Sequence, residues 1–113
     1  MLTIDALKEL GADTDVALAR CMKNESFYFR LIGIGIRDAN FDNLKKSIQE
    51  GDLQRAFESA HALKGVMGNL SLNNLTGPVT EITEQLRARE ERDYMPQVEK
   101  ILSERDKVAA LLD

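Results

Sequence analysis

The sequence predicts an all-α fold, an antiparallel up-down four-helix bundle with one or two short N-terminal helices. Apolar residues recur at three- and four-residue steps through segments 53–70, 72–86 and 98–112, which is the spacing of helices that face a core on one side. Helix-favouring residues such as Ala, Leu, Glu and Lys are plentiful, while proline occurs only twice. The segments are joined by short turns, and short connections place sequential helices antiparallel.

Two short helices are expected before the bundle, where they would cap one end of it. Thr3 is the candidate N-cap of the first helix, which stops at Gly11, and Asp13 or Thr14 is the N-cap of the second. We expect the buried side chains of the second helix to include Val16, Leu18, Ala19 and Met22.

Segment 25–49 supplies the first long element of the bundle. Its residues 27–36, FYFRLIGIGI, end in an alternation of large residues and glycine that could form a strand, but no second strand candidate exists to pair with it. We therefore expect a helix that begins at Asn24. Gly33-x-Gly35 lacks the preceding strand and the longer glycine pattern of a phosphate-binding loop, so these glycines are expected at a crowded helix–helix contact.

Polar side chains mark where the remaining helices begin. We expect four of them to be N-caps: Asn40, Asp52, Ser71 and Asp93. Gly51 ends the helix that starts at Asn40. The apolar spacing continues unchanged through Pro78, which predicts one kinked helix rather than two. Pro96 falls in the first turn of the last helix, where proline is tolerated.

Length and composition limit the classes of function. At 113 residues the chain is expected to form one domain, residues 1–113, and its 43% apolar and 30% charged residues are typical of a globular protein. The net charge of −4, with scattered basic residues, argues against a nucleic-acid partner. Cys21 is the only cysteine, so no metal site is expected. We expect no signal peptide and no membrane partner, and a cytoplasmic location.

The helix over 53–70 carries a polar face opposite its apolar stripe. Residues on this face follow each other at three- and four-residue steps and are Gln54, Glu58, His61, Gly65 and Gly68. His61, the only histidine of the chain, is therefore expected to face solvent. Histidine is a covalent nucleophile, and its phosphoramidate is a transferable linkage.

The neighbours of His61 fit this chemistry. A helical side chain leans over the preceding turn, so a side chain at position 65 would cover His61, and Gly65 and Gly68 leave the imidazole clear. Tight helix packing is the alternative reason for two glycines within a helix, where glycine is unfavourable. Lys64 lies three residues from His61, close enough to offset negative charge that arrives there.

The segment His61-Ala62-Leu63-Lys64-Gly65, followed by Gly68-Asn69-Leu70, resembles the signature of histidine-containing phosphotransfer domains. That signature is H-x-L-K-G, then small residues, then a leucine or an aromatic residue. The resemblance covers residues 5–110, and the family fold is a four-helix bundle with one or two N-terminal helices. The chain departs from the family pattern at Gly33, Gly35 and Pro78, and at Ser71, where the family commonly has glycine.

The resemblance implies that His61 accepts a phosphoryl group from the phospho-aspartate of one receiver domain and passes it to an aspartate of another. Lys64 would stabilise the phosphoryl group, Gly65 and Gly68 would clear the docking surface, and apolar surface near His61 would bind the partner. The expected partners are response-regulator receiver domains, which supply the Mg²⁺, and a hybrid sensor histidine kinase. On this interpretation the chain is a carrier and not an enzyme, holds no cofactor, and acts as a monomer.

Two other interpretations stay open. The chain could be a helical docking module whose histidine is not phosphorylated, although such a module would have little reason to keep His61 and Lys64 together. It could also be the phosphoacceptor domain of a chemotaxis-type histidine kinase, which shares the H-x-x-K-G core. A hydrolase is disfavoured, because the sequence offers no Ser/His/Asp or Cys/His set.

Overall fold

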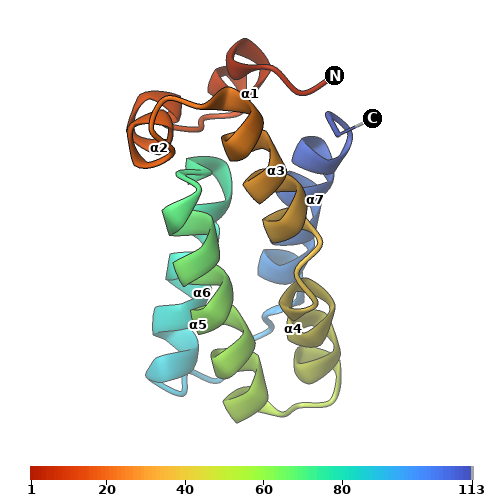
Figure 1. Cartoon of the computed structure of the whole chain (residues 1–113). Helices are drawn as coiled ribbons and strands as arrows, with labels where there is room; N and C mark the ends of the chain where they lie inside the picture. Colours follow the sequence, from red (N-terminus) through yellow and green to blue (C-terminus); the bar gives the residue numbers. More distant parts are fainter. Residues whose placement is uncertain (113) are drawn as a thin grey trace.

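The computed structural model of the chain describes residues 1–112 and confirms the all-α prediction. Over these residues the chain forms helices and no strand. The helices are α1 (Ile4–Glu9), α2 (Thr14–Arg20), α3 (Glu25–Ile36), α4 (Asn40–Gln49), α5 (Leu53–Asn69), α6 (Asn73–Arg87) and α7 (Met95–Ala109). Three columns of an antiparallel bundle are single helices, α5, α6 and α7, and the fourth column is α3 followed by α4 (Figure 1).

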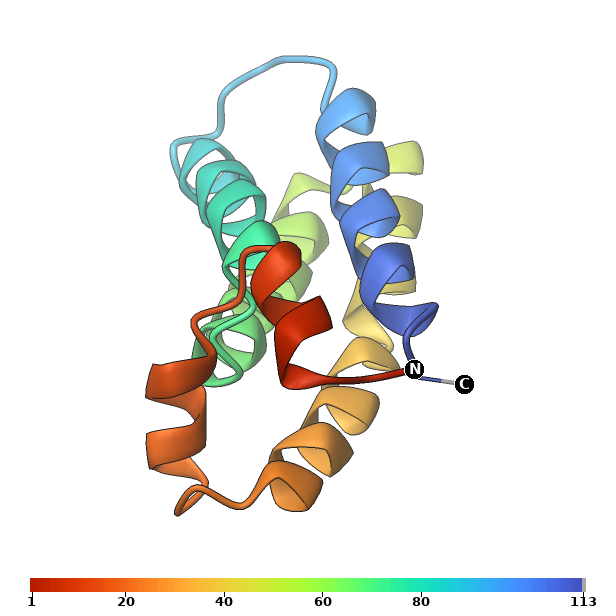
Figure 2. The ribbon, with the colours of Figure 1, turned by 90° about the horizontal axis from the view of Figure 1, so that it is seen from above.

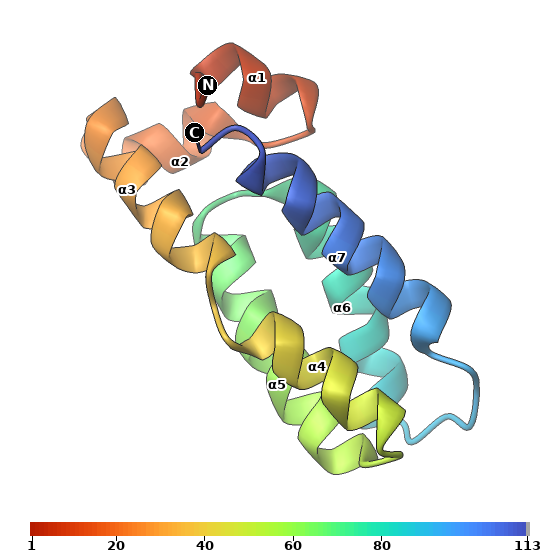
Figure 3. The same ribbon diagram turned by 90° about the vertical axis from the view of Figure 1, so that its right-hand side faces the viewer.

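The break in the fourth column lies between α3 and α4, which follow each other along α5 (Figure 3). Asn40 was expected to be the N-cap of α4, and this prediction is wrong: the N-cap is Ala39, whose backbone is already helical (φ −61°, ψ −19°), and Asn40 is the first helical residue. The reason is the tight turn between the two helices. It brings the Asp38 carboxylate to the backbone N–H of Asn40, from which it accepts a hydrogen bond of 2.8 Å.

The core lies between the four columns. Its fully buried side chains come from every column and include Tyr28, Ile32, Phe41, Leu44, Leu63, Met67, Leu75, Ile82, Leu86 and Ile101. The Tyr28 hydroxyl donates a hydrogen bond of 2.7 Å to the carbonyl of Leu70, which ties α3 to the end of α5. Burial raises the pKa of Tyr28 to about 12.

Helices α1 and α2 lie across one end of the bundle, as Figure 2 shows from above. Thr3 and Asp13 are their N-caps, as predicted. The predicted burial of α2 is wrong, because Val16, Ala19 and Met22 are exposed, Met22 by 91%, and Leu18 is only half-buried. The side of α2 that meets the bundle carries Thr14 and Ala17 instead, and the next turn adds the buried Cys21. A short helix at the end of a bundle buries a single narrow face. The positions of its apolar residues do not predict which face that is.

The two glycines of α3 have different surroundings. A Cβ at Gly35 would lie 2.6 Å from Leu70 Cδ1 and 3.2 Å from Val66 Cγ1, so the predicted crowded contact between helices is confirmed there. A Cβ at Gly33 would meet only Arg37 Nη1 of the same helix, at 3.1 Å, so the prediction is wrong for Gly33. The Arg37 guanidinium covers Gly33 because it donates a hydrogen bond of 3.0 Å to the Gly33 carbonyl.

Ser71 was expected to be an N-cap, and this prediction is also wrong. Ser71 follows the C-cap of α5 in the left-handed region, with φ +56°. Its N–H donates to the Gly68 carbonyl and the N–H of Leu72 donates to the Met67 carbonyl, which is the Schellman arrangement that usually has glycine at this position. Leu72 is the N-cap of α6 and has no side-chain cap.

The remaining helix boundaries agree more closely with expectation. Asn24 and Asp52 are the N-caps of α3 and α5, and α6 continues through Pro78 as one helix. Asp93 lies one residue before the N-cap of α7, Tyr94, so the cap prediction is off by one residue. The Asp93 carboxylate still accepts a hydrogen bond from the N–H of Met95, at 3.1 Å.

Candidate functional site

His61 lies on the exposed side of α5, as its place in the helical pattern predicts. The residues that face the core from the same helix, Ala56, Ala60, Leu63 and Met67, have no exposed surface. Asp52 starts α5 by accepting a hydrogen bond from the N–H of Arg55, at 3.0 Å. His61 is therefore held by a long helix whose position is set by its buried face, so the imidazole is presented to solvent on a rigid element.

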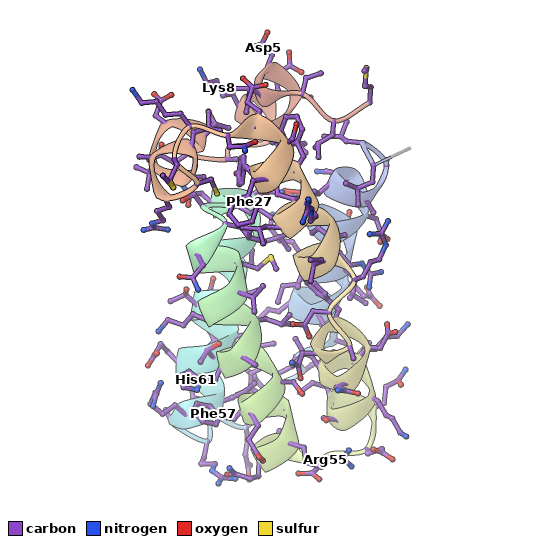
Figure 4. All side chains as sticks on the ribbon, viewed as in Figure 1. Asp5, Lys8, Phe27, Arg55, Phe57 and His61 are labelled. Carbon is purple, nitrogen blue, oxygen red and sulfur yellow. The ribbon has the colours of Figure 1, made fainter. Side chains whose placement is uncertain are left out.

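The imidazole of His61 rests against the ring of Phe57, one turn earlier on α5. The two ring centroids are 5.4 Å apart and the planes differ by 11°, which is a stacked pair. Figure 4 shows both side chains along the lower half of α5. The apolar spacing of segment 53–70 includes Phe57 and places it on the core side, but Phe57 is only half-buried and its ring supports His61. The i, i+4 spacing of two aromatic side chains is the signal that predicts this contact.

Lys64 takes part in an ion pair across the α5–α6 contact. Its Nζ is 3.4 Å from Oε1 of Glu84, and Oε2 of the same carboxylate accepts a hydrogen bond of 3.2 Å from Nε of Arg87. This hydrogen bond is the main reason that the pKa of the Glu84 carboxyl is lowered, and the charge of Arg87 and the contact with Lys64 lower it further. Glu84 therefore stays ionised as the shared partner of two cations.

Arg87 also reaches the aromatic pair, since its guanidinium carbon is 5.0 Å from the centroid of the Phe57 ring. The site thus joins two residues that sequence reasoning missed, Glu84 and Arg87, to Phe57 and Lys64. The pair Glu84–Arg87 has i, i+3 spacing and is predictable from sequence. The Lys64–Glu84 pair is not, because it depends on the register between α5 and α6.

Gly65 and Gly68 are the glycines expected to clear the surface beside His61. A Cβ built at either position meets nothing within 4 Å outside its own helix turn. Tight packing within this chain therefore does not explain them, in contrast to Gly35. Glycine within a helix lowers stability, so two glycines on the His61 face require an explanation other than packing within this chain.

An apolar groove opens beside the same face of α5, where α3 packs against it. The groove is lined by Leu31, Ile34, Gly35, Val66, Asn69 and Leu70. Ile34 is 63% exposed, and Phe27, about two turns earlier on α3, is 42% exposed. In Figure 4, Phe27 lies toward the opposite end of α5 from His61.

Among residues 1–112, no three His, Cys, Asp or Glu side chains gather closely enough to hold a metal ion. In the same part of the chain, no helix combines the length and apolar character needed to cross a membrane.

Comparison with known proteins gives one match. The family model of the Hpt domain matches residues 38–113, a segment that begins just before α4 and includes His61 and Lys64. No curated protein and no solved structure matches the chain. Members of the Hpt family carry phosphoryl groups in two-component signalling. Because the match covers well over half of the chain, the protein belongs to the Hpt family, the histidine-containing phosphotransfer domains of phosphorelays.

Proposed function

We propose that His61 is the phosphorylated residue of this phosphotransfer domain. The observation behind the proposal is that the single histidine of the chain is exposed on α5, within the segment that matches the family. A ring nitrogen of His61 attacks the phosphorus of a receiver aspartyl phosphate. The N–P bond forms as the O–P bond to the aspartate breaks, and the carboxylate is the leaving group. The reverse reaction delivers the phosphoryl group to the aspartate of a second receiver.

Lys64 is proposed to stabilise the phosphoryl group on His61. The two residues are three positions apart on one helix, so their side chains emerge on neighbouring surface. A phosphoryl group brings close to two negative charges, and an adjacent ammonium reduces the free energy of placing them on the helix. The second cation, Arg87, lies against Phe57 and adds to the positive charge on this side of α5.

Gly65 and Gly68 are proposed to let the receiver approach the His61 helix closely. Their open surroundings support this role, since a Cβ at either position would have no neighbour within 4 Å outside its own helix turn. The apolar groove with Ile34 and Val66 is proposed as the adjoining docking surface. Exposed apolar area next to a reactive residue is typical of a protein-binding surface.

We propose that the chain is a carrier and not an enzyme, with the Mg²⁺ and the acidic pocket supplied by the receiver. The carboxylate on α6 beside this site, Glu84, is engaged by Lys64 and Arg87, which disfavours it as a proton acceptor for His61.

We further propose that residues 1–113 act as one domain and as a cytoplasmic monomer, without nucleic acid or membrane partners. The proposed donor is the receiver domain of a hybrid sensor histidine kinase. The Asp13 N–H donates to the Ser71 carbonyl at 2.9 Å, which supports one domain.

Phosphoryl transfer from a labelled receiver tests the proposal directly. A receiver domain carrying labelled aspartyl phosphate is mixed with the protein, and the label on the protein is tested for lability in acid and stability in base. Wild-type protein should take up such label, and His61→Gln should take up none. Absence of transfer to the wild type would favour the unphosphorylated docking module, and equal labelling of His61→Gln would exclude His61 as the acceptor.

A further inference from the structure

Two cations at this site share one carboxylate. Lys64 on α5 and Arg87 on α6 both contact Glu84, at 3.4 Å and 3.2 Å. Glu84 is half-exposed, as is Arg87, and Lys64 is about one-third exposed, so these contacts lie at the surface and can exchange. The three side chains together carry one net positive charge, which becomes two if Glu84 is neutralised.

We infer that Glu84 is a positioning residue that acts through Lys64, holding the ammonium while His61 is unmodified and releasing it when the phosphoryl group arrives. The inference rests on the proposed function of His61 and Lys64. The phosphoryl oxygens carry more negative charge than one carboxylate, so they draw the ammonium away from Glu84. Arg87 remains as the partner of Glu84, so the carboxylate is not left unpaired.

Competition of this kind affects how tightly His61 keeps its phosphoryl group. The carboxylate and the phosphoryl group compete for the same ammonium. The stabilisation of the phosphoryl group by Lys64 is therefore reduced by the free energy needed to break the Lys64–Glu84 ion pair. His61 therefore holds the phosphoryl group less tightly than it would beside a free lysine. This is a useful property in a carrier, which has to pass the group on. No further reactant is needed, because the transfer still exchanges only the O–P bond for the N–P bond.

Glu84→Gln tests this role, and Glu81→Gln is the matched control. Glu81 lies on the same helix, is exposed, and is hydrogen-bonded only to Gln85, so its substitution removes the same charge without touching Lys64. Each variant is brought to equilibrium with a phosphorylated receiver, and the fraction of His61 that carries the label is measured. Glu84→Gln should raise the ratio of labelled to unlabelled protein by about two- to fivefold, the size expected of an exposed ion pair. Glu81→Gln should leave the ratio near the wild-type value.

The same measurement in a Lys64→Gln background shows whether the effect passes through Lys64. We expect the rise caused by Glu84→Gln to disappear in that background. A rise that persists there, an equal rise in Glu81→Gln, or a ratio unchanged in Glu84→Gln would each overturn the inference. Wild-type protein that takes no label would remove the proposed function and the inference together, whereas labelled wild type with an unchanged Glu84→Gln removes the inference alone.

The side-chain ammonium signal of Lys64 gives a readout that a purely structural role would not affect. In the unmodified protein, its nitrogen resonance should differ between wild type and Glu84→Gln, because only the wild type has the ion pair. After phosphorylation the two signals should converge, since Lys64 then faces the phosphoryl group in both proteins. Signals that stay apart after phosphorylation would show that Lys64 never leaves Glu84, contrary to the inference.

Discussion

The ring of Phe57 stacks on the imidazole of His61, with 5.4 Å between centroids and 11° between planes. The contact restricts the rotation of the only histidine in the chain without covering it, because His61 stays exposed. Phe57 also contacts Arg87, which is linked to Lys64 through Glu84, and Gly65 and Gly68 lie on the same face of α5 as His61.

Phe57→Leu separates stacking from burial, because leucine keeps an apolar side chain at this half-buried position. We expect it to lower the free energy of unfolding by about 1 kcal/mol, from loss of the aromatic stack and the cation–π contact with Arg87. Transfer from a phosphorylated receiver should slow, because the imidazole is less restricted. Chemical denaturation and transfer rates measure the two effects. A transfer rate equal to that of the wild type would show that stacking does not orient His61.

Gly65→Leu should block transfer and leave the fold intact. A Cβ at position 65 has no atom within 4 Å outside its own helix turn, so the larger side chain displaces no core residue and would lean over the turn that carries His61. Gly65→Ala is the graded control, and it should raise the free energy of unfolding by about 0.5–1 kcal/mol through better helix propensity. Thermal unfolding and receiver-dependent labelling are the measurements. If Gly65→Leu is labelled at the full rate, clearance is not the role of Gly65.

Gly35→Ala and Gly33→Ala make a matched pair on α3. At Gly35 the new methyl group would lie 2.6 Å from Leu70 Cδ1, and we expect a loss of about 1–3 kcal/mol in the free energy of unfolding. At Gly33 the only close atom belongs to the flexible side chain of Arg37, so alanine should be neutral or slightly stabilising. Urea denaturation of the two variants compares them. Equal losses would contradict the assignment of the close contact to Gly35.

Ser71→Gly should stabilise the protein. Ser71 has φ +56° at the end of α5, a conformation that is unfavourable for a residue with a Cβ and usual for glycine. We expect a gain of about 0.5–1 kcal/mol, reduced by the greater freedom of glycine in the unfolded chain. Gly51→Ser is the reciprocal control, because Gly51 has φ +73° at the end of α4, and it should lose a similar amount. A stabilised Gly51→Ser or a destabilised Ser71→Gly would contradict this account.

Stability should fall between pH 10 and pH 12 because of Tyr28. Burial raises the pKa of Tyr28 to about 12 in the folded state, above the ordinary value of 10.0. Between these values the unfolded chain loses the proton and the folded chain keeps it, so rising pH favours unfolding. The contribution is fully present below pH 10 and is lost by pH 12. Tyr28→Phe should show a shallower decline over this range, and it should also be about 1 kcal/mol less stable at pH 7, since the Leu70 carbonyl loses its hydrogen bond.

Features that follow from periodicity along one helix were predictable from the sequence alone. The all-α bundle, the helical state of 27–36, the continuity of α6 through Pro78 and the exposure of His61 all depend on spacing within a single segment. The caps at Asp13, Asn24 and Asp52 are equally local, since each side chain bonds to an N–H three residues ahead. Such features were predictable because the physical interactions behind them span one or two turns.

Contacts between residues of different helices depend on how the helices pack, and the sequence did not predict them. The register of α5 against α6 brings Lys64 to Glu84, and the approach of α3 to α5 makes Gly35 necessary while leaving Gly33 free of α5. The same holds for α2, where Val16 and Ala19 are exposed because the side that meets the bundle is the one with Thr14 and Ala17. The packing of the whole core sets the register between two helices and the distance between their axes. The residue pattern of one helix predicts neither of them. The Lys64–Glu84 ion pair was therefore not predictable from the sequence, whereas the Glu84–Arg87 pair lies within α6 and was.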